Sequence, residues 1–235
     1  MKRFWKEVAV GPGRVVALDG RPVRTPSREL LALPTDALAE AVAEEWRGVG
    51  ETLDPRAMPL TGLANAAIDR IASDRPGFAA GLARFGESDL LYYRADGPAE
   101  LAQRQAALWD PALDWARGRY NVYFELATGV MHRPQPAATV QRLGEAVGTL
   151  DEWALAGLSP VVTITGSLVL ALALVEGALD ADAVWRAANV DEDWQEERWG
   201  EDALAAQARE GRRRDYDAGV RFLAVPAVRP VSAYG

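Results

Sequence analysis

Residues 15–23 read Val15-Val16-Ala17-Leu18-Asp19-Gly20-Arg21-Pro22-Val23, and this stretch decides the class of fold. The apolar, mostly β-branched residues before Asp19 are typical of a β-strand. Asp19-Gly20 tolerates the positive φ angles of a tight hairpin turn, so residues 21–25 are expected to return as the next strand, with Pro22 at a sheet edge. Another strand is expected at residues 7–10, before the turn residues 11–13. The N-terminal region is therefore predicted to be antiparallel β-structure.

Helical spacing replaces this pattern after Pro34. Thr35 can cap a helix near residues 35–48, which Gly48 and Gly50 would end. The strongest amphipathic pattern follows, with apolar residues three and four positions apart at Leu60, Leu63, Ala64, Ala67, Ile68 and Ile71. Further helices are expected near residues 76–85, 98–117, 136–150, 160–177, 180–190 and 201–222, the fourth of them starting at Ser159-Pro160.

These patterns predict an α+β fold, in which a small N-terminal antiparallel β domain is followed by a larger, mainly α-helical domain. The change of period places the boundary between residues 48 and 60. We expect a β-rich N-terminal domain at residues 1–55, which includes the helix near 35–48, and a mainly helical C-terminal domain at residues 56–235.

Composition restricts the classes of partner. The chain has 235 residues and a formal net charge of −8, which argues against sequence-independent nucleic-acid binding and favours a basic protein surface as partner. It has no cysteine, so disulfides and thiolate metal sites are excluded and a reducing compartment is expected. The longest apolar run, residues 161–175, is interrupted by polar residues and is short for a bilayer span, so no stable membrane insertion is expected. The N-terminus has the features of neither a signal peptide nor a transit peptide.

The sequence contains no recognisable catalytic or cofactor motif. His132 is the only histidine, and no serine lies in a Gly-x-Ser-x-Gly elbow. The segment Gly11-Pro12-Gly13 lacks the third glycine of a dinucleotide-binding loop, and no phosphate-binding loop occurs. We therefore expect no enzyme activity, no catalytic residues, no cofactor and no metal site.

Carboxylates cluster between residues 191 and 202, balanced locally only by Arg198. A metal site or the paired acids of a hydrolase are conceivable, although the spacing matches no calcium loop. The common interpretation of such a run is a solvated helix face. Trp194 and Trp199 within it favour a recognition surface, since tryptophan is enriched at binding hot spots. On one helix, Glu192, Gln195, Trp199 and Asp202 would form a single stripe, unless Gly200 interrupts it.

A series of landmarks along the chain resembles the Atp-twelve family of F-type ATP synthase assembly factors. The resemblance extends over residues 4–202 and is most specific at residues 58–69. The landmarks are Phe4-Trp5, residues 18–23, 33–35, Glu45-Trp46, residues 58–69, 88–95, 109–115, 165–167 and 191–195, and Trp199-Gly200. Trp46 is similar to the family's tryptophan after a glutamate, and its helical position favours a packing role.

The resemblance implies a soluble assembly chaperone without cofactor. Such a protein would bind the unassembled alpha subunit of the ATP synthase head, prevent its aggregation and promote assembly of the alpha/beta hexamer. We expect a monomer located in a bacterial cytoplasm, since a mitochondrial matrix relative would carry a transit peptide. The residues that the resemblance and the acidic cluster single out for client contact are Glu192, Gln195, Glu196, Trp199, Gly200, Glu201 and Asp202.

Two alternatives remain open at this point. One is a carboxylate-dependent hydrolase that uses the 191–202 cluster. The other is a chaperone of the same fold that serves a different client.

Overall fold

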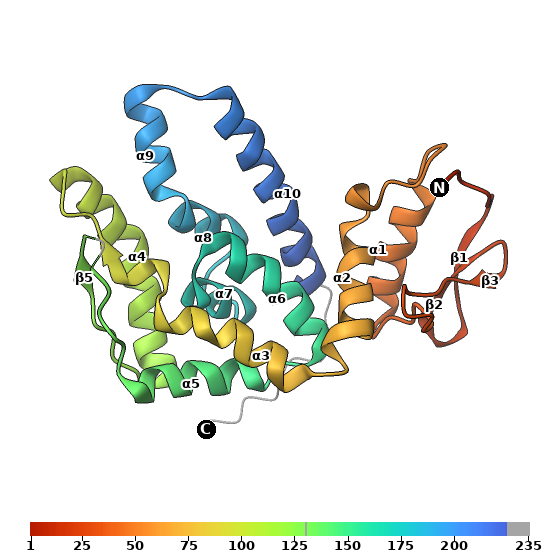
Figure 1. Cartoon of the computed structure of the whole chain (residues 1–235), viewed down its shortest axis with the longest axis horizontal. Helices are drawn as coiled ribbons and strands as arrows, with labels where there is room; N and C mark the ends of the chain where they lie inside the picture. Colours follow the sequence, from red (N-terminus) through yellow and green to blue (C-terminus); the bar gives the residue numbers. More distant parts are fainter. Residues whose placement is uncertain (130, 225–235) are drawn as a thin grey trace. The chain divides into compact units, whose positions relative to one another are not determined.

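The structure, a computed structural model, describes residues 1–129 and 131–224 (Figure 1). The chain divides into two compact units. Of the described residues, unit 1 comprises 1–78, 150–158 and 217–224, and unit 2 comprises 79–129, 131–149 and 159–216. A division into domains at residues 55 and 56 stays a prediction.

Unit 1 begins with a three-stranded antiparallel sheet of order β1-β2-β3. Its strands are β1 (Val8–Gly11), β2 (Val15–Leu18) and β3 (Arg21–Pro22), so the predicted hairpin is confirmed and Pro22 lies in an edge strand. Asp19 and Gly20 form the turn with φ angles of 47° and 76°. The Asp19 carboxylate accepts hydrogen bonds from the backbone N–H groups of Lys6 and Glu7 at 3.0 and 2.8 Å, and these bonds lower its pKa.

Helix α1 (Asp36–Arg47) packs against this sheet and also fixes the next helix. Thr35 caps α1 as predicted, because its hydroxyl accepts a hydrogen bond from the N–H of Leu38 at 3.2 Å. The Glu45 carboxylate accepts the N–H groups of Leu60 and Thr61 at 2.7 and 2.8 Å at the start of α2 (Pro59–Ala66). Burial raises the pKa of Glu45. A π-helical turn, η3 (Ala67–Ile71), continues α2.

Two tryptophans form the centre of the contact between the N-terminal segment and α1. The rings of Trp5 and Trp46 lie 5.4 Å apart and both are buried. Trp5 Nε1 donates to the backbone oxygen of Trp46 at 3.4 Å, whereas Trp46 Nε1 is buried without a partner among the described residues. The packing role predicted for Trp46 agrees with this position.

Unit 2 is mainly helical. A two-stranded parallel sheet of β4 (Tyr93–Arg94) and β5 (Ala127–Thr128) is its β-structure within the described residues. The chain passes between the units within α3 (Arg75–Ala83), α6 (Glu152–Thr165) and α10 (Ala203–Ala224). The other helices of unit 2 are α4 (Ala99–Tyr120), α5 (Ala137–Gly148), α7 (Leu168–Val175), α8 (Ala181–Ala188) and α9 (Val190–Trp199). Short 3-10 turns complete the fold at η1 (Pro12–Arg14), η2 (Pro55–Ala57), η4 (Arg84–Glu87) and η5 (Leu90–Tyr92).

The single helix expected over residues 160–177 is wrong. Helix α6 starts at Glu152 and contains Pro160, and Gly166, with a φ angle of 66°, separates it from α7. A left-handed residue cannot continue a right-handed helix, so the apolar run is divided there. Ser167 begins the second helix by accepting the N–H of Leu170 at 3.0 Å. Among the described residues, no helix combines the length and apolar character that crossing a bilayer requires.

Asp89 connects the start of α7 with η5 inside unit 2. Its side chain is completely buried. Oδ1 accepts the N–H of Leu91 and Oδ2 accepts the N–H of Val169, each at 3.0 Å. Burial raises its pKa from 3.8 to about 6, although these hydrogen bonds act in the opposite direction. One carboxylate thus satisfies backbone donors from two segments eighty residues apart in the chain.

Candidate functional site

The acidic cluster lies on α9 and on the connection to α10. Trp194 is only 3% exposed, and the guanidinium carbons of Arg104 and Arg198 lie 4.8 and 4.4 Å from its ring centroid. Of the two tryptophans that favoured a recognition surface, Trp194 is therefore not available to a partner. This residue anchors α9 through cation–π contacts, whereas Trp199 is 78% exposed.

Helix α10 neutralises one side of the cluster. Arg212 contacts Glu192 at 2.6 Å, and Arg209 contacts both Glu196, at 3.0 Å, and Asp193. Because residues later in α9 contact residues earlier in α10, the two helices run antiparallel as a helical hairpin (Figure 1). Arg209 and Arg212 of the following helix thus balance the cluster in addition to Arg198.

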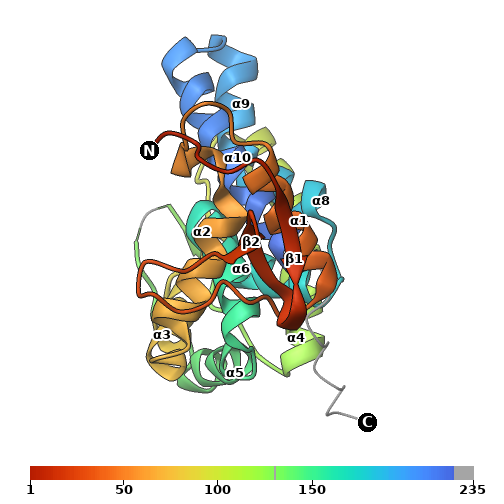
Figure 2. The same ribbon diagram turned by 90° about the vertical axis from the view of Figure 1, so that its right-hand side faces the viewer.

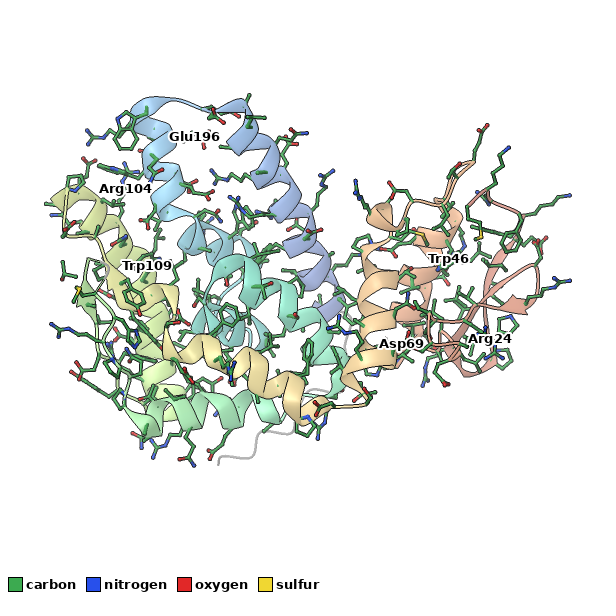
Figure 3. The ribbon with its side chains drawn as sticks, viewed as in Figure 1. Arg24, Trp46, Asp69, Arg104, Trp109 and Glu196 are labelled. Carbon is green, nitrogen blue, oxygen red and sulfur yellow. The ribbon has the colours of Figure 1, made fainter. Side chains whose placement is uncertain are left out.

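Helix α4 supports the other side of α9. Arg104 contacts Glu197 at 2.7 Å, and the Gln105 amide donates to Asp191 at 2.7 Å. Figure 3 shows Arg104 on α4 and Glu196 on α9. Exposed ion pairs contribute at most about 1 kcal/mol each, so it is their number on both sides of the helix that holds α9 in place.

The hairpin tip, residues 199–204, presents the accessible part of the cluster. Gly200, with a φ angle of 85°, ends α9, and Asp202 begins α10 by accepting the N–H of Ala205 at 2.8 Å. Trp199 and Leu204 are each 78% exposed. Glu201 is exposed and makes no hydrogen bond or ion pair with the described residues. The tip therefore combines two large apolar side chains with an unpaired acid.

The seven residues predicted for client contact fall into two groups. Glu192, Gln195 and Glu196 lie on the body of α9, where both glutamates are paired with α10. The others, Trp199, Gly200, Glu201 and Asp202, lie at the tip. The predicted stripe along one helix is interrupted at Gly200, because Asp202 is not part of α9. Sequence reasoning missed Leu204, whose only signal is a large apolar residue two positions after the acidic pair Glu201-Asp202.

The exposed apolar and acidic side chains of this site are suited to binding a partner. Asp193, Glu196, Glu197 and Glu201 line a shallow, open depression. Within residues 1–129 and 131–224, no three His, Asp or Glu side chains are arranged to hold a metal ion. An apolar tip bordered by carboxylates fits a partner that offers apolar surface beside Lys or Arg residues.

Known proteins share this fold over nearly the whole chain. A family model described as ATP12 chaperone protein matches residues 2–117. The crystal structure of Atp12 from Paracoccus denitrificans superposes with a TM-score of 0.88 at 41% identity, covering 95% of this chain and 97% of that chain. The chain belongs to the ATP12 chaperone family.

Other relatives agree with the ATP12 assignment. The Atu1473 protein of Agrobacterium tumefaciens is 41% identical with a TM-score of 0.90, covering 95% of this chain and 85% of that chain. The mitochondrial protein atp12 of Schizosaccharomyces pombe is 27% identical over 214 residues, which are 85% of this chain and 74% of the relative. The predicted α+β fold, with an N-terminal antiparallel sheet before a mainly helical region, is confirmed.

ATP12 family membership makes the chain a chaperone and not an enzyme. It supports the predicted role in ATP synthase assembly, and it removes the carboxylate-dependent hydrolase as an alternative. Three acids of that cluster, Glu192, Glu196 and Glu197, instead form ion pairs that hold α9 against α4 and α10.

Proposed function

We propose that the chain binds the unassembled alpha subunit of the F-type ATP synthase head through the hairpin tip, prevents its aggregation and promotes assembly of the alpha/beta hexamer. The observation that carries the proposal is the tip itself, where Trp199 and Leu204 are exposed on either side of the unpaired Glu201. Family membership supports the chaperone role, and the sequence resemblance supplies the alpha subunit as client.

Physical reasoning supports this mode of action. An unassembled ring subunit exposes interface surface that otherwise aggregates, and a chaperone must cover it but release it to the proper partner. A small apolar contact with an acidic border provides moderate affinity and a fast encounter with a basic surface. The chaperone would act as a monomer in the bacterial cytoplasm and would need no cofactor.

Reversing the charge of the tip tests the proposal. We expect the double variant Glu201→Lys with Asp202→Lys to bind the alpha subunit at least about tenfold more weakly, because attraction to a basic surface becomes repulsion. The measurement is suppression of alpha-subunit aggregation by light scattering, together with a pull-down at low and moderate salt. Loss of the Asp202 cap should cost only about 1 kcal/mol of stability.

A matched control carries the same charge change on the exposed face of α10. Glu210→Lys with Asp215→Lys should suppress aggregation as well as the wild type does, since both residues are exposed and lie outside the tip. If the tip variant protects the alpha subunit as well as this control does, the tip is not the contact. Recovery of a different protein in the pull-down, without the alpha subunit, would assign another client.

The exposed tryptophan is expected to be the strongest single contact. Trp199→Ala should weaken alpha-subunit binding by about 2 kcal/mol, or roughly thirtyfold, because buried aromatic anchors dominate interfaces. Its stability should stay within about 0.5 kcal/mol of the wild type, since the side chain is exposed. Tyr123→Ala, which removes another exposed ring, serves as the control in the same titration. Equal affinities of the two variants would argue against an anchor at Trp199.

A further inference from the structure

The N-terminal sheet of unit 1 has one buried face and one open face. Val16, Leu18, Val23 and Leu31 point inward and are buried. Strand pairing places the alternate residues on the opposite face, where all are exposed or half-exposed. This outer face consists of Ala9, Val15, Ala17, Pro22, Arg24, Leu30 and Ala32. In Figure 2, β1 and β2 lie at the front of the view, and no helix of unit 1 passes before them.

An arginine loop, residues 24–30, extends this face. Arg24 and Leu30 are paired across its base, and Arg28 lies near its tip. Neither Arg24 nor Arg28 forms an ion pair with a carboxylate of the described residues. Residues 1–30 contain seven Lys or Arg and three Asp or Glu residues, although the whole chain has a net charge of −8. The first thirty residues, which include the loop, are therefore cationic although the protein as a whole is acidic.

Asp69 of η3 holds the loop in place from the inner side. Its Oδ1 accepts a hydrogen bond from the Thr25 hydroxyl at 2.6 Å, and its Oδ2 accepts one from the Ser27 N–H at 3.0 Å. Arg28 has a φ angle of 71°, a conformation that non-glycine residues rarely adopt. Arg24 donates to the backbone oxygen of Arg28 at 2.7 Å. The loop is thus ordered before any partner arrives, which lowers the entropy cost of binding.

We infer that the outer face and the arginine loop bind an acidic, partly apolar polypeptide segment of the client, as a second contact separate from the hairpin tip. The apolar face suits small apolar side chains, and the guanidiniums of Arg24 and Arg28, which have no carboxylate partner among the described residues, suit carboxylates of a ligand. A polypeptide fits better than a nucleic acid, because the two arginines of the loop, on a protein of net charge −8, give little attraction for a polyphosphate. This inference depends on the proposed function for one point, the identity of the client.

A peptide titration tests the surface without the client. The probe is a labelled peptide alternating Glu and Val, with a Lys and Val peptide and a single-stranded oligonucleotide as comparisons, all measured by fluorescence anisotropy. Arg24→Gln with Arg28→Asn should weaken binding of the acidic peptide about tenfold, since two charge contacts are lost. Asparagine tolerates the φ angle at position 28. Arg133→Gln with Arg186→Gln, two exposed arginines of unit 2, should change the affinity less than about twofold.

A second variant separates preorganisation from charge. Asp69→Ala makes the surface more positive, so attraction by charge alone would strengthen binding of the acidic peptide. Loss of the hydrogen bonds to Thr25 and Ser27 should instead weaken peptide binding, because the loop is no longer held in its binding conformation. An affinity equal to or above that of the wild type would contradict the claim that the loop is preorganised. Two results would overturn the inference as a whole. One is that the Arg24→Gln with Arg28→Asn variant binds the acidic peptide as tightly as the wild type does. The other is that the wild type binds the oligonucleotide more tightly than the acidic peptide.

The alpha subunit itself distinguishes the two proposals. If the tip variant loses the alpha subunit and the arginine-loop variant keeps it, the second contact is wrong and the proposed function stands. If the wild type does not bind the alpha subunit but binds the acidic peptide through the loop, the proposed client is wrong and the surface stands. Weaker binding of the alpha subunit by both variants supports both proposals.

Discussion

Asp89→Ala is expected to lower the free energy of unfolding by about 2–5 kcal/mol, because two buried N–H groups lose their acceptor. Those donors belong to Leu91 and Val169, and the second lies in the first turn of α7. A carboxylate at this position also interacts favourably with the helix dipole. Denaturant unfolding followed by circular dichroism measures the change. A loss below about 1 kcal/mol would mean that water or a rearranged backbone replaces the carboxylate.

The Asp89 carboxylate also makes the stability of the wild type depend on pH. The pKa of Asp89 is raised to about 6 in the folded protein from an ordinary value of 3.8. The folded state therefore binds the proton more tightly than the unfolded state, and this contribution to stability is complete below pH 3.8 and is lost as the pH rises through about 6. Raising the pKa from 3.8 to about 6 corresponds to about 3 kcal/mol of unfolding free energy gained in acid.

Asp89→Asn cannot gain this contribution, because its amide does not titrate. We expect Asp89→Asn to be less stable than the wild type already near neutral pH, because its Nδ2 cannot accept the second backbone N–H, and we expect this deficit to grow as the pH falls. The difference between the two unfolding free energies, followed across this range of pH, removes the effects of all other groups. A difference that does not change with pH would show that Asp89 titrates near its ordinary value.

Trp46→Arg is expected to prevent stable folding of unit 1. Trp46 is 9% exposed and packs against Trp5. An arginine there would bury an unpaired charge at a cost of several kcal/mol, in addition to the lost aromatic contact. The result should be a low yield of folded protein and a much lower midpoint of denaturation.

Two variants make this prediction specific to the site. Trp46→Phe keeps an apolar ring and removes the unpartnered Nε1, so its loss should not exceed about 1.5 kcal/mol. Trp199→Arg makes the same substitution at an exposed tryptophan and should leave the unfolding free energy within about 0.5 kcal/mol of the wild type. Equal stability of the Trp46→Arg and Trp199→Arg variants would contradict the packing role of Trp46.

Elements that depend on neighbouring residues could be predicted from the sequence. The Asp19-Gly20 turn, the Thr35 cap and the amphipathic pattern from Leu60 onward all gave elements close to those in the structure. Each depends on a few consecutive residues. The division of the apolar run at Gly166 could not be predicted in the same way, because an apolar stretch looks alike whether it forms one helix or two.

The candidate site likewise has features that could be predicted from the sequence and features that could not. The acids and Trp199 stand out in the sequence, and the family resemblance drew attention to the same segment. The burial of Trp194 could not be predicted, since it depends on Arg104 of α4 and on how α9 packs there. Pairing of Glu192 with Arg212 likewise requires the hairpin to form, which no local pattern indicates.

The two parts of helix α10 belong to different units, and this limits how the protein can be truncated. Its first part carries Arg209 and Arg212, which hold α9, and its last turns belong to unit 1, where Phe222 stacks on Trp153 at 6.3 Å. A truncation before residue 217 leaves the tip in place but removes Phe222 from its stacking partner. A fragment of unit 1 without α10 has the same defect. Unit 1 is therefore not a self-sufficient fragment without the last turns of α10, although its chain begins far from that helix in the sequence.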